Sequence, residues 1–154
     1  MNKKLLFLLA SLALSTMVCV FPNLDTGYFA VSQPALTELA GKYVPTKETW
    51  DYIRNEGHYE ATEISIVLSS DLSLEMKNMP DWWTNDFGKS DGKLDSLKGT
   101  WSVVKRQEWW ELGLDFPSLT TSVPIVGKQP PYTLWFYIGD PDEGHVMIFE
   151  KVSE

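Results

Sequence analysis

An acidic turn near the C-terminus is the stretch whose residue types could do chemistry. Residues 140–144 read Asp-Pro-Asp-Glu-Gly, and oxygen-rich turns suit hard cations such as Ca²⁺. A calcium loop needs further acidic ligands at fixed offsets and a late glutamate, and Glu150 does not fit that spacing. The same residues satisfy hairpin chemistry, because proline fixes φ, aspartate accepts hydrogen bonds from local amides and glycine supplies a positive φ. We therefore predict a hairpin turn here and no metal site.

Acid–base and nucleophilic chemistry have little support elsewhere in the chain. His58 and His145 are the only histidines, and neither has neighbours at metal-ligand spacing. Pairs of carboxylates could do acid–base work, but the chain holds 21 acidic residues, so such pairs arise without any function. There is no nucleophile motif and no glycine-rich phosphate loop. We predict that the protein is not an enzyme and uses no metal or cofactor, with a carboxylate-based hydrolase as the third hypothesis.

Tryptophans are the candidate binding residues. Trp82 and Trp83 follow Pro80 in the segment 78–95, which is rich in aspartate and glycine. We expect this segment to be the longest irregular stretch of the domain, and such loops tend to be functional or mobile. The pair could stack a sugar or an apolar partner. Alternatively, the loop folds over the end of a barrel and one tryptophan plugs it.

A second group of aromatic residues falls at positions that we expect to face outward from strands. Trp109, Trp135 and Tyr137 would then form a surface stripe of the kind that binds a partner. They would equally serve to dock a helix, and Trp50 lies on the best predicted helix. Both interpretations stay open from the sequence alone.

The first 21 residues have the layout of a bacterial-type export signal. A short basic stretch at residues 2–4 precedes an apolar run from Leu5 to Leu14, and the small residues Ala13 and Ser15 have the spacing of a cleavage site after Ser15. The run can also be extended to Phe21, which makes it seventeen residues long, the lower limit for a membrane-spanning helix. We expect an exported domain that is periplasmic or secreted, or tethered to the membrane by residues 5–21.

The composition of the exported part limits its chemistry further. Cys19 is the only cysteine, so no disulfide forms within the chain, and Val18 stands where lipid attachment to Cys19 would need a small residue. Packing of seven Trp, seven Phe and six Tyr must hold the domain together. Without Lys3 and Lys4 the formal net charge falls from −8 to −10. Such a surface repels nucleic acids and disfavours anionic lipid heads, so we expect membrane contact only through the N-terminal segment.

Two-residue periodicity dominates the chain after residue 39. The even positions from 110 to 116 are apolar and alternate with Trp109, Glu111, Gly113 and Asp115, as in a strand with one buried face. The domains we expect are a signal or anchor at 1–21, a tether at 22–38 and a single β domain at 39–154. Strands are predicted at 39–45, 62–68, 72–76, 99–105, 109–116, 118–126, 132–138 and 145–151.

One short helix accompanies these strands. Thr46 can cap a helix over residues 47–55, and Gly57 follows its end; a helical turn is also expected within 34–39. Eight strands joined in sequence, without long helices between them, favour an antiparallel sheet. We predict a mainly β fold, an up-and-down barrel or curled meander of about eight strands.

Two short motifs carry a resemblance to a known family. Residues 39–43 (LAGKY) and 97–101 (LKGTW) both read L-x-G-x-aromatic before a strand. This resembles the Gly-x-Trp entry to lipocalin-like (calycin) barrels, whose last strand often brings a basic residue across that aromatic. Lys151, at the end of the last predicted strand, would take that place. The span 39–151, with its late Gly-Asp-Pro-Asp turn, also resembles small exported bacterial proteins with a lipocalin-like fold and no assigned activity.

These features lead to two main hypotheses. In the first, the protein is an exported, non-catalytic binding module of the cell envelope that holds a small apolar ligand inside the barrel or binds another envelope protein through an aromatic patch. In the second, it is an inhibitor or immunity-type protein whose acidic surface blocks a basic partner site. An internal ligand would be excluded if the barrel were packed solid by Phe116, Leu134, Phe136 and Ile148.

Overall fold

The structure is a computed structural model that describes residues 28–84, 90–140 and 144–153. The predicted export signal or anchor and the central residues of the acidic turn, Asp142 and Glu143, lie outside the described residues.

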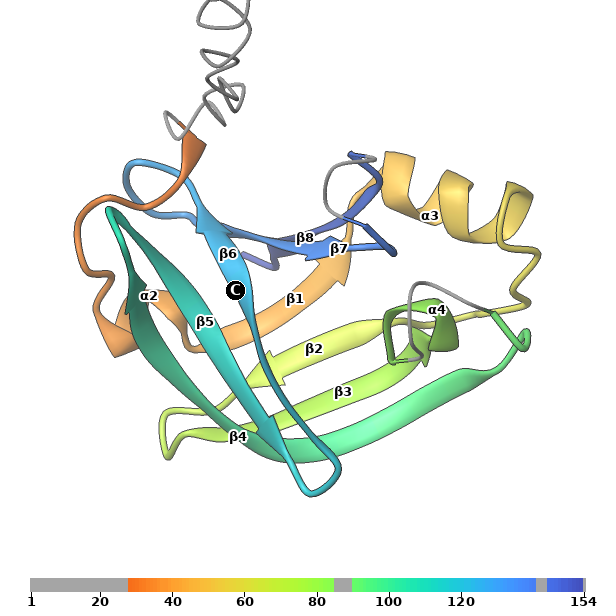
Figure 1. Ribbon diagram of the computed structural model, residues 1–154, viewed down its shortest axis with the longest axis horizontal. Helices are drawn as coiled ribbons and strands as arrows, with labels where there is room; N and C mark the ends of the chain where they lie inside the picture. Colours follow the sequence, from red (N-terminus) through yellow and green to blue (C-terminus); the bar gives the residue numbers. More distant parts are fainter. Residues whose placement is uncertain (1–27, 85–89, 141–143, 154) are drawn as a thin grey trace, which may run out of the picture.

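Eight antiparallel strands close into an up-and-down barrel in the order of the sequence, as predicted (Figure 1). The barrel closes where β1 pairs with β8 as well as with β2. The strands are β1 (Gly41–Pro45), β2 (Ser65–Leu68), β3 (Ser73–Pro80), β4 (Leu94–Arg106), β5 (Trp109–Phe116), β6 (Leu119–Val126), β7 (Thr133–Tyr137) and β8 (Val146–Lys151).

Alternation along the strands places the core as expected in most of the barrel. Leu112, Leu114 and Phe116 of β5 are buried, while Trp110 at the end of the barrel is half-buried. Ile64, Ile66 and Leu68 are buried around β2 in the same way. Leu72 departs from the prediction, because it belongs to the β2–β3 turn with a φ of 70° and is exposed.

The face of β8 that points inward was predicted wrongly. Ile148 is half-buried on the outside, and Met147 and Phe149 have no exposed surface. The register explains this, because directly opposed residues of neighbouring strands share a face. Met147 pairs with Phe136 and Phe149 pairs with Leu134, so the inward residues of β7 select the inward residues of β8. The sequence of β8 is apolar on both faces and contains no such signal.

Helix α3 (Lys47–Asn55) has the predicted bounds and the predicted cap. The amide of Thr49 donates to Oγ1 of Thr46 at 3.3 Å, and the buried residues Thr49 and Ile53 face the barrel. The hydroxyl of Thr49 also bonds to the backbone of Ile148 in β8. Two further short helices are α2 (Leu36–Leu39), close to the expected helical turn, and α4 (Asp81–Thr84). In the described part of the chain no helix has the length and apolarity needed to cross a membrane.

The segment 78–95 is more regular than predicted. Strand β3 continues to Pro80, α4 follows at once, and β4 begins at Leu94. A hydrogen bond from the amide of Asp81 to the carbonyl of Lys93, at 3.0 Å, closes the connection. Residues 85–89 lie outside the described residues. The ordered ends of this connection are joined by Asp81, whose side chain accepts hydrogen bonds from residues nine or more positions away in sequence.

The packed domain begins before the predicted boundary at residue 39. Phe29 and Ala30, which belong to the expected tether, are buried. The amide of Ala30 donates to the carbonyl of Ile125 in β6, and the carbonyl of Ala30 accepts from the amide of Trp110 in β5. Residues 28–30 thus fill the space between β5 and β6 beyond Glu111, where the direct pairing of these two strands ends.

The two ends of the barrel are covered by different elements. The α2 end, at the left of Figure 1, carries residues 28–40, the turns 69–72 and 107–108, the loop 127–132 and the end of β8. The α3/α4 end carries the connections 46–64 and 81–93, the turn 117–118 and the turn 138–145. Every connection therefore belongs to one end or the other, as an up-and-down barrel requires.

Candidate functional site

The barrel interior is filled by side chains from its own strands. Phe136 and Phe149 pack edge to face with ring centroids 5.2 Å apart. Their neighbours in the interior have no exposed surface, which leaves no water-sized space beside them. The residues with none are Tyr43, Ile66, Met76, Met79, Leu112, Ile125, Leu134, Phe136, Met147 and Phe149.

The tryptophans of α4 close the α3/α4 end of this interior. Trp83 packs edge to face on Phe136, at 5.0 Å between ring centroids, and on Phe116 at 6.5 Å. Trp82 is only 6 % exposed, and its Nε1 lies 3.3 Å from Sδ of Met147. Trp82 is therefore buried, and of the two alternatives that the sequence left open the arrangement matches the plug over the barrel end.

A buried carboxylate holds this plug in place. Asp81 is 2 % exposed and accepts hydrogen bonds from the hydroxyl of Tyr59 and from the amides of Asp91 and Lys93, the latter two at 2.8 and 3.2 Å. Burial raises the pKa of Asp81, but the hydrogen bonds outweigh it and leave that pKa below its ordinary value. Burial and the bond to Asp81 raise the pKa of Tyr59 to about 12. An ionised carboxylate surrounded by donors is a structural anchor and a poor proton donor.

The histidines are not brought together. The Nδ1 atom of His145 lies 3.1 Å from the hydroxyl of Tyr52 on α3, and the Tyr52 ring contacts Trp82 at 5.5 Å between centroids. His58 is exposed in the connection after α3, with a φ of 57°. Among the described residues no group of three or more His, Cys, Asp or Glu could hold a metal ion.

The outward aromatic stripe exists, and the chain itself covers part of it. Trp109 and Trp135 are half-buried, and Phe29 packs on both, with ring centroids 5.6 and 6.2 Å away. Trp50 is partly buried against the core, and the guanidinium of Arg54 lies 4.6 Å from its ring. The segment 28–30, rather than a helix, is thus the element that packs on these two tryptophans.

Glu111 lies beside the stripe and was not singled out from the sequence. Its side chain is 12 % exposed and accepts hydrogen bonds from Nε1 of Trp109 at 2.9 Å and from the hydroxyl of Ser122. The guanidinium of Arg106 lies 3.4 Å from the same carboxylate. Burial, and after it the charge of Glu111, raises the pKa of Tyr137 on β7. The strand alternation predicts an outward position for Glu111 and places Trp109 beside it on the same face of β5. Ser122 of β6 and Arg106 of β4 are brought to it only by the pairing of the strands.

A shallow hollow adjoins Glu111 on the outer face of β4, β5 and β6. Gly113 forms its floor, and Ser102, Thr120 and Ser122 supply hydroxyl groups around it. The hollow has a volume of about 370 Å³. The hollow, Glu111 and the half-buried Trp109 and Trp135 all lie on the outside of the barrel, on strands β4 to β7. We call this set the outer face patch.

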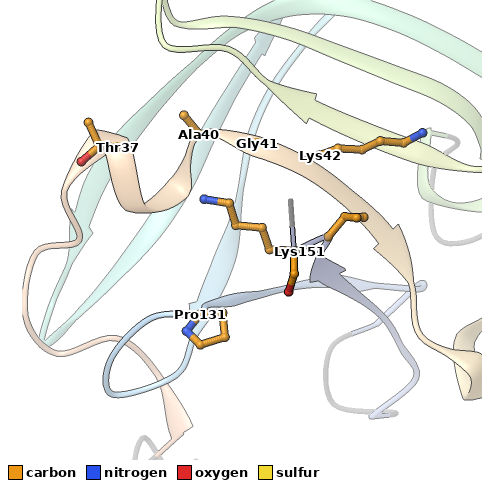
Figure 2. A pocket seen from close by; sticks show the side chains of 8 residues that line it. Thr37, Ala40, Gly41, Lys42, Pro131 and Lys151 are labelled. Atoms are coloured by element: carbon orange, nitrogen blue, oxygen red, sulfur yellow. The ribbon is translucent and has the colours of Figure 1, made fainter.

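A groove of about 590 Å³ lies at the α2 end, between α2, the start of β1, Pro131 and the C-terminal residues (Figure 2). Lys151 crosses it, and its Nζ donates to the carbonyl of Glu38 at 2.8 Å. Lys42 points away from Lys151 in Figure 2 and pairs with Glu63 at 3.3 Å. The groove therefore holds one ammonium group, which is already bonded.

The expected approach of Lys151 to the aromatic residue of β1 is confirmed. Lys151 is the register partner of Tyr43, and the hydroxyl of Tyr43 donates to the carbonyl of Leu39 at 2.9 Å. Burial raises the pKa of Tyr43 far above its ordinary value. Gly41 has a φ of 147°, and a Cβ at this position would lie 2.6 Å from Cε of Lys151. The backbone conformation favours glycine here, and a larger residue would also displace the end of the Lys151 side chain.

Comparisons with protein-family models, with curated proteins and with solved structures each found no match. The site must therefore be interpreted from its own geometry.

Proposed function

We propose that this protein is an exported, non-catalytic binding module of the cell envelope that recognises a protein partner on the outside of its barrel. The observation that carries the proposal is the filled interior, because a barrel that binds a small apolar ligand needs a cavity of some hundreds of Å³. The side chains of Leu112, Phe136 and Phe149 occupy that space. Gly41, Tyr43 and Lys151 support a lipocalin-like class for the barrel, although its filled interior leaves no ligand cavity.

The outer face patch is the surface that we assign to the partner. Half-exposed Trp109 and Trp135 can be buried further by a partner, and tryptophans dominate the binding energy of many interfaces. Glu111 sits among donors that hold its carboxylate in one orientation, which favours a defined hydrogen bond with a partner over a diffuse charge contact.

A second candidate surface is the acidic α3/α4 end, which favours the inhibitor or immunity-type hypothesis. Among the described connections of that end, Lys47, Arg54 and Lys93 are outnumbered by acidic residues. The acidic residues at the surface of this end are Glu48, Asp51, Glu56, Glu60, Glu63, Asp91 and Asp140. A basic partner site would be attracted to this end, with an association rate that falls as salt is added.

Site-specific photo-crosslinking in the host envelope tests both surfaces together. A photoreactive residue at position 135 should give one discrete adduct, and the same residue at position 56 on the acidic end should give none. An adduct only from position 56, lost in high salt, would support the second candidate. Absence of adducts from both positions, together with a small apolar molecule co-purifying with the protein, would contradict the proposal.

A further inference from the structure

The exposed large apolar side chains of the described chain all lie at one end of the barrel. In an up-and-down barrel the β2–β3 turn, the β6–β7 loop and the end of β8 lie at the same end as the start of β1. The amide of Gly127 in that loop donates to the carbonyl of Tyr28, which places the first described residues there too. These side chains, 37 to 60 % exposed, are Tyr28, Val31, Leu36, Leu72 and Val152.

Charge is divided unevenly between the two ends. The described residues of the α2 end, with the two terminal residues of each strand that reaches it, are close to neutral in charge. The cationic ones are Lys42, Lys105, Arg106, Lys128 and Lys151, and the anionic ones are Glu38, Asp71, Glu108 and Glu150. The α3/α4 end is strongly acidic, as stated above. The negative net charge of the whole chain therefore does not apply to the α2 end. The repulsion from anionic lipid heads that the composition suggests acts at the opposite, acidic end.

The preceding chain enters the domain at this same end. Six residues, 22–27, separate the apolar run that ends at Phe21 from Tyr28, and fully extended they reach at most about 20 Å. Residues 28–30 are fixed between β5 and β6 by three backbone hydrogen bonds. Any membrane attachment through residues 5–21 would therefore bring the α2 end, and not the acidic end, close to the bilayer.

We propose that the α2 end is a docking surface for a phospholipid bilayer. Leu36, Leu72 and Val152 insert at the level of the headgroups, Tyr28 lies at the interface where its ring and hydroxyl are both accommodated, and Lys105 and Lys128 contact lipid phosphates. The inference goes beyond the proposed function, because it concerns how the domain is oriented and not what it binds. It leaves the acidic end turned away from the bilayer and the outer face patch on the side of the barrel.

Fluorescence at single cysteines in the full chain tests the docking. In a Cys19→Ser background, cysteines replace Leu36, Leu72 or, as a control on the acidic end, Glu56, and each carries a polarity-sensitive fluorophore. The protein is bound to vesicles of phosphatidylcholine with a minor fraction of phosphatidylglycerol that contain a lipid-attached quencher. We expect quenching and a blue shift at positions 36 and 72 and neither at position 56.

Paired variants separate docking from simple attachment by the N-terminal run. Leu36→Ser with Val152→Ser should lower the quenching at position 72 roughly threefold, since both side chains are exposed and their loss leaves the core intact. The matched pair Lys47→Ser with Asp51→Ser, an exposed ion pair on α3, should leave it unchanged. Equal quenching at all three positions, or none at 36 and 72 on vesicle-bound protein, would overturn the proposal.

Discussion

At the scale of single residues, a few side chains hold segments that are distant in sequence. Asp81 binds Tyr59 before β2 and the amides of Asp91 and Lys93 before β4, and so fixes α4 over the barrel end. Glu111 joins neighbouring strands on the outer face, through Trp109 of its own strand β5 and Ser122 of β6. Both are acidic residues among 21 in the sequence, and nothing in their spacing distinguishes them. Only the fold reveals which carboxylates are buried among donors.

Replacement of Asp81 by asparagine should destabilise the protein in a pH-dependent way. The pKa of Asp81 in the folded state lies below its ordinary value, so its contribution is present above the unfolded-chain pKa of about 4 and is lost as the pH falls through the folded pKa. We expect Asp81→Asn to lower the free energy of unfolding by about 2 kcal/mol at neutral pH, with the difference shrinking below about pH 4.

Urea unfolding across a pH series measures this difference. Asp91→Asn is the control, because the side chain of Asp91 is exposed and only weakly paired with Lys93, at 3.8 Å. A constant difference between wild type and Asp81→Asn at every pH would show that the carboxylate contributes through shape and not through charge.

Two glycines on the strands should respond differently to alanine. A methyl group at Gly99 would overlap the backbone carbonyl oxygen of Asp115, which cannot move without breaking the β4–β5 pairing. At Gly113 it would meet the hydroxyl of Ser102 at 2.7 Å, and that side chain can rotate away. We expect Gly99→Ala to lower the free energy of unfolding by about 3 kcal/mol and Gly113→Ala by less than about 1 kcal/mol. Equal denaturation midpoints for the two variants would contradict this interpretation.

At the scale of elements, the sequence predicts what local patterns specify. Alternation predicts the strands, and Thr46 with Gly57 predicts the bounds of α3, because both signals lie within the segment itself. The inward face of β8 was not predictable, since both faces are apolar and the register with β7 decides. Residues 28–30 have no period at all, and their burial depends on the open hydrogen-bonding positions of Trp110 and Ile125.

The N-terminal segment should contribute to stability as a part of the barrel. Phe29 is 5 % exposed and contacts Trp109 and Trp135, so Phe29→Ala should lower the free energy of unfolding by about 3 kcal/mol. The two tryptophans would gain exposure, and we expect the emission of the folded protein to shift to longer wavelength. Tyr28→Ala is the control, because Tyr28 is 60 % exposed. An unchanged spectrum and midpoint in Phe29→Ala would mean that the segment is a free tether.

At the scale of the whole molecule, the barrel has a solid interior and two unlike ends. Trp83 and the interior side chains leave no route for a ligand at the α3/α4 end, and Lys151 crosses the α2 end. Specific contacts are therefore left to the outside, where aromatic groups, acidic groups and exposed apolar groups occupy three separate regions. A small domain with this division can orient itself at a bilayer and present the other regions to a partner.

The filled interior is the claim on which the account depends most directly, and titration with an apolar fluorescent fatty-acid analogue tests it. Phe136→Ala, which opens a cavity between Trp83 and Phe149, serves as the positive control, since a dry apolar cavity of that kind accepts small apolar molecules. We expect no saturable binding to the native protein and one saturable site in the variant. Stoichiometric binding of the analogue to the native protein, with its emission quenched by the buried Trp101, would contradict the account.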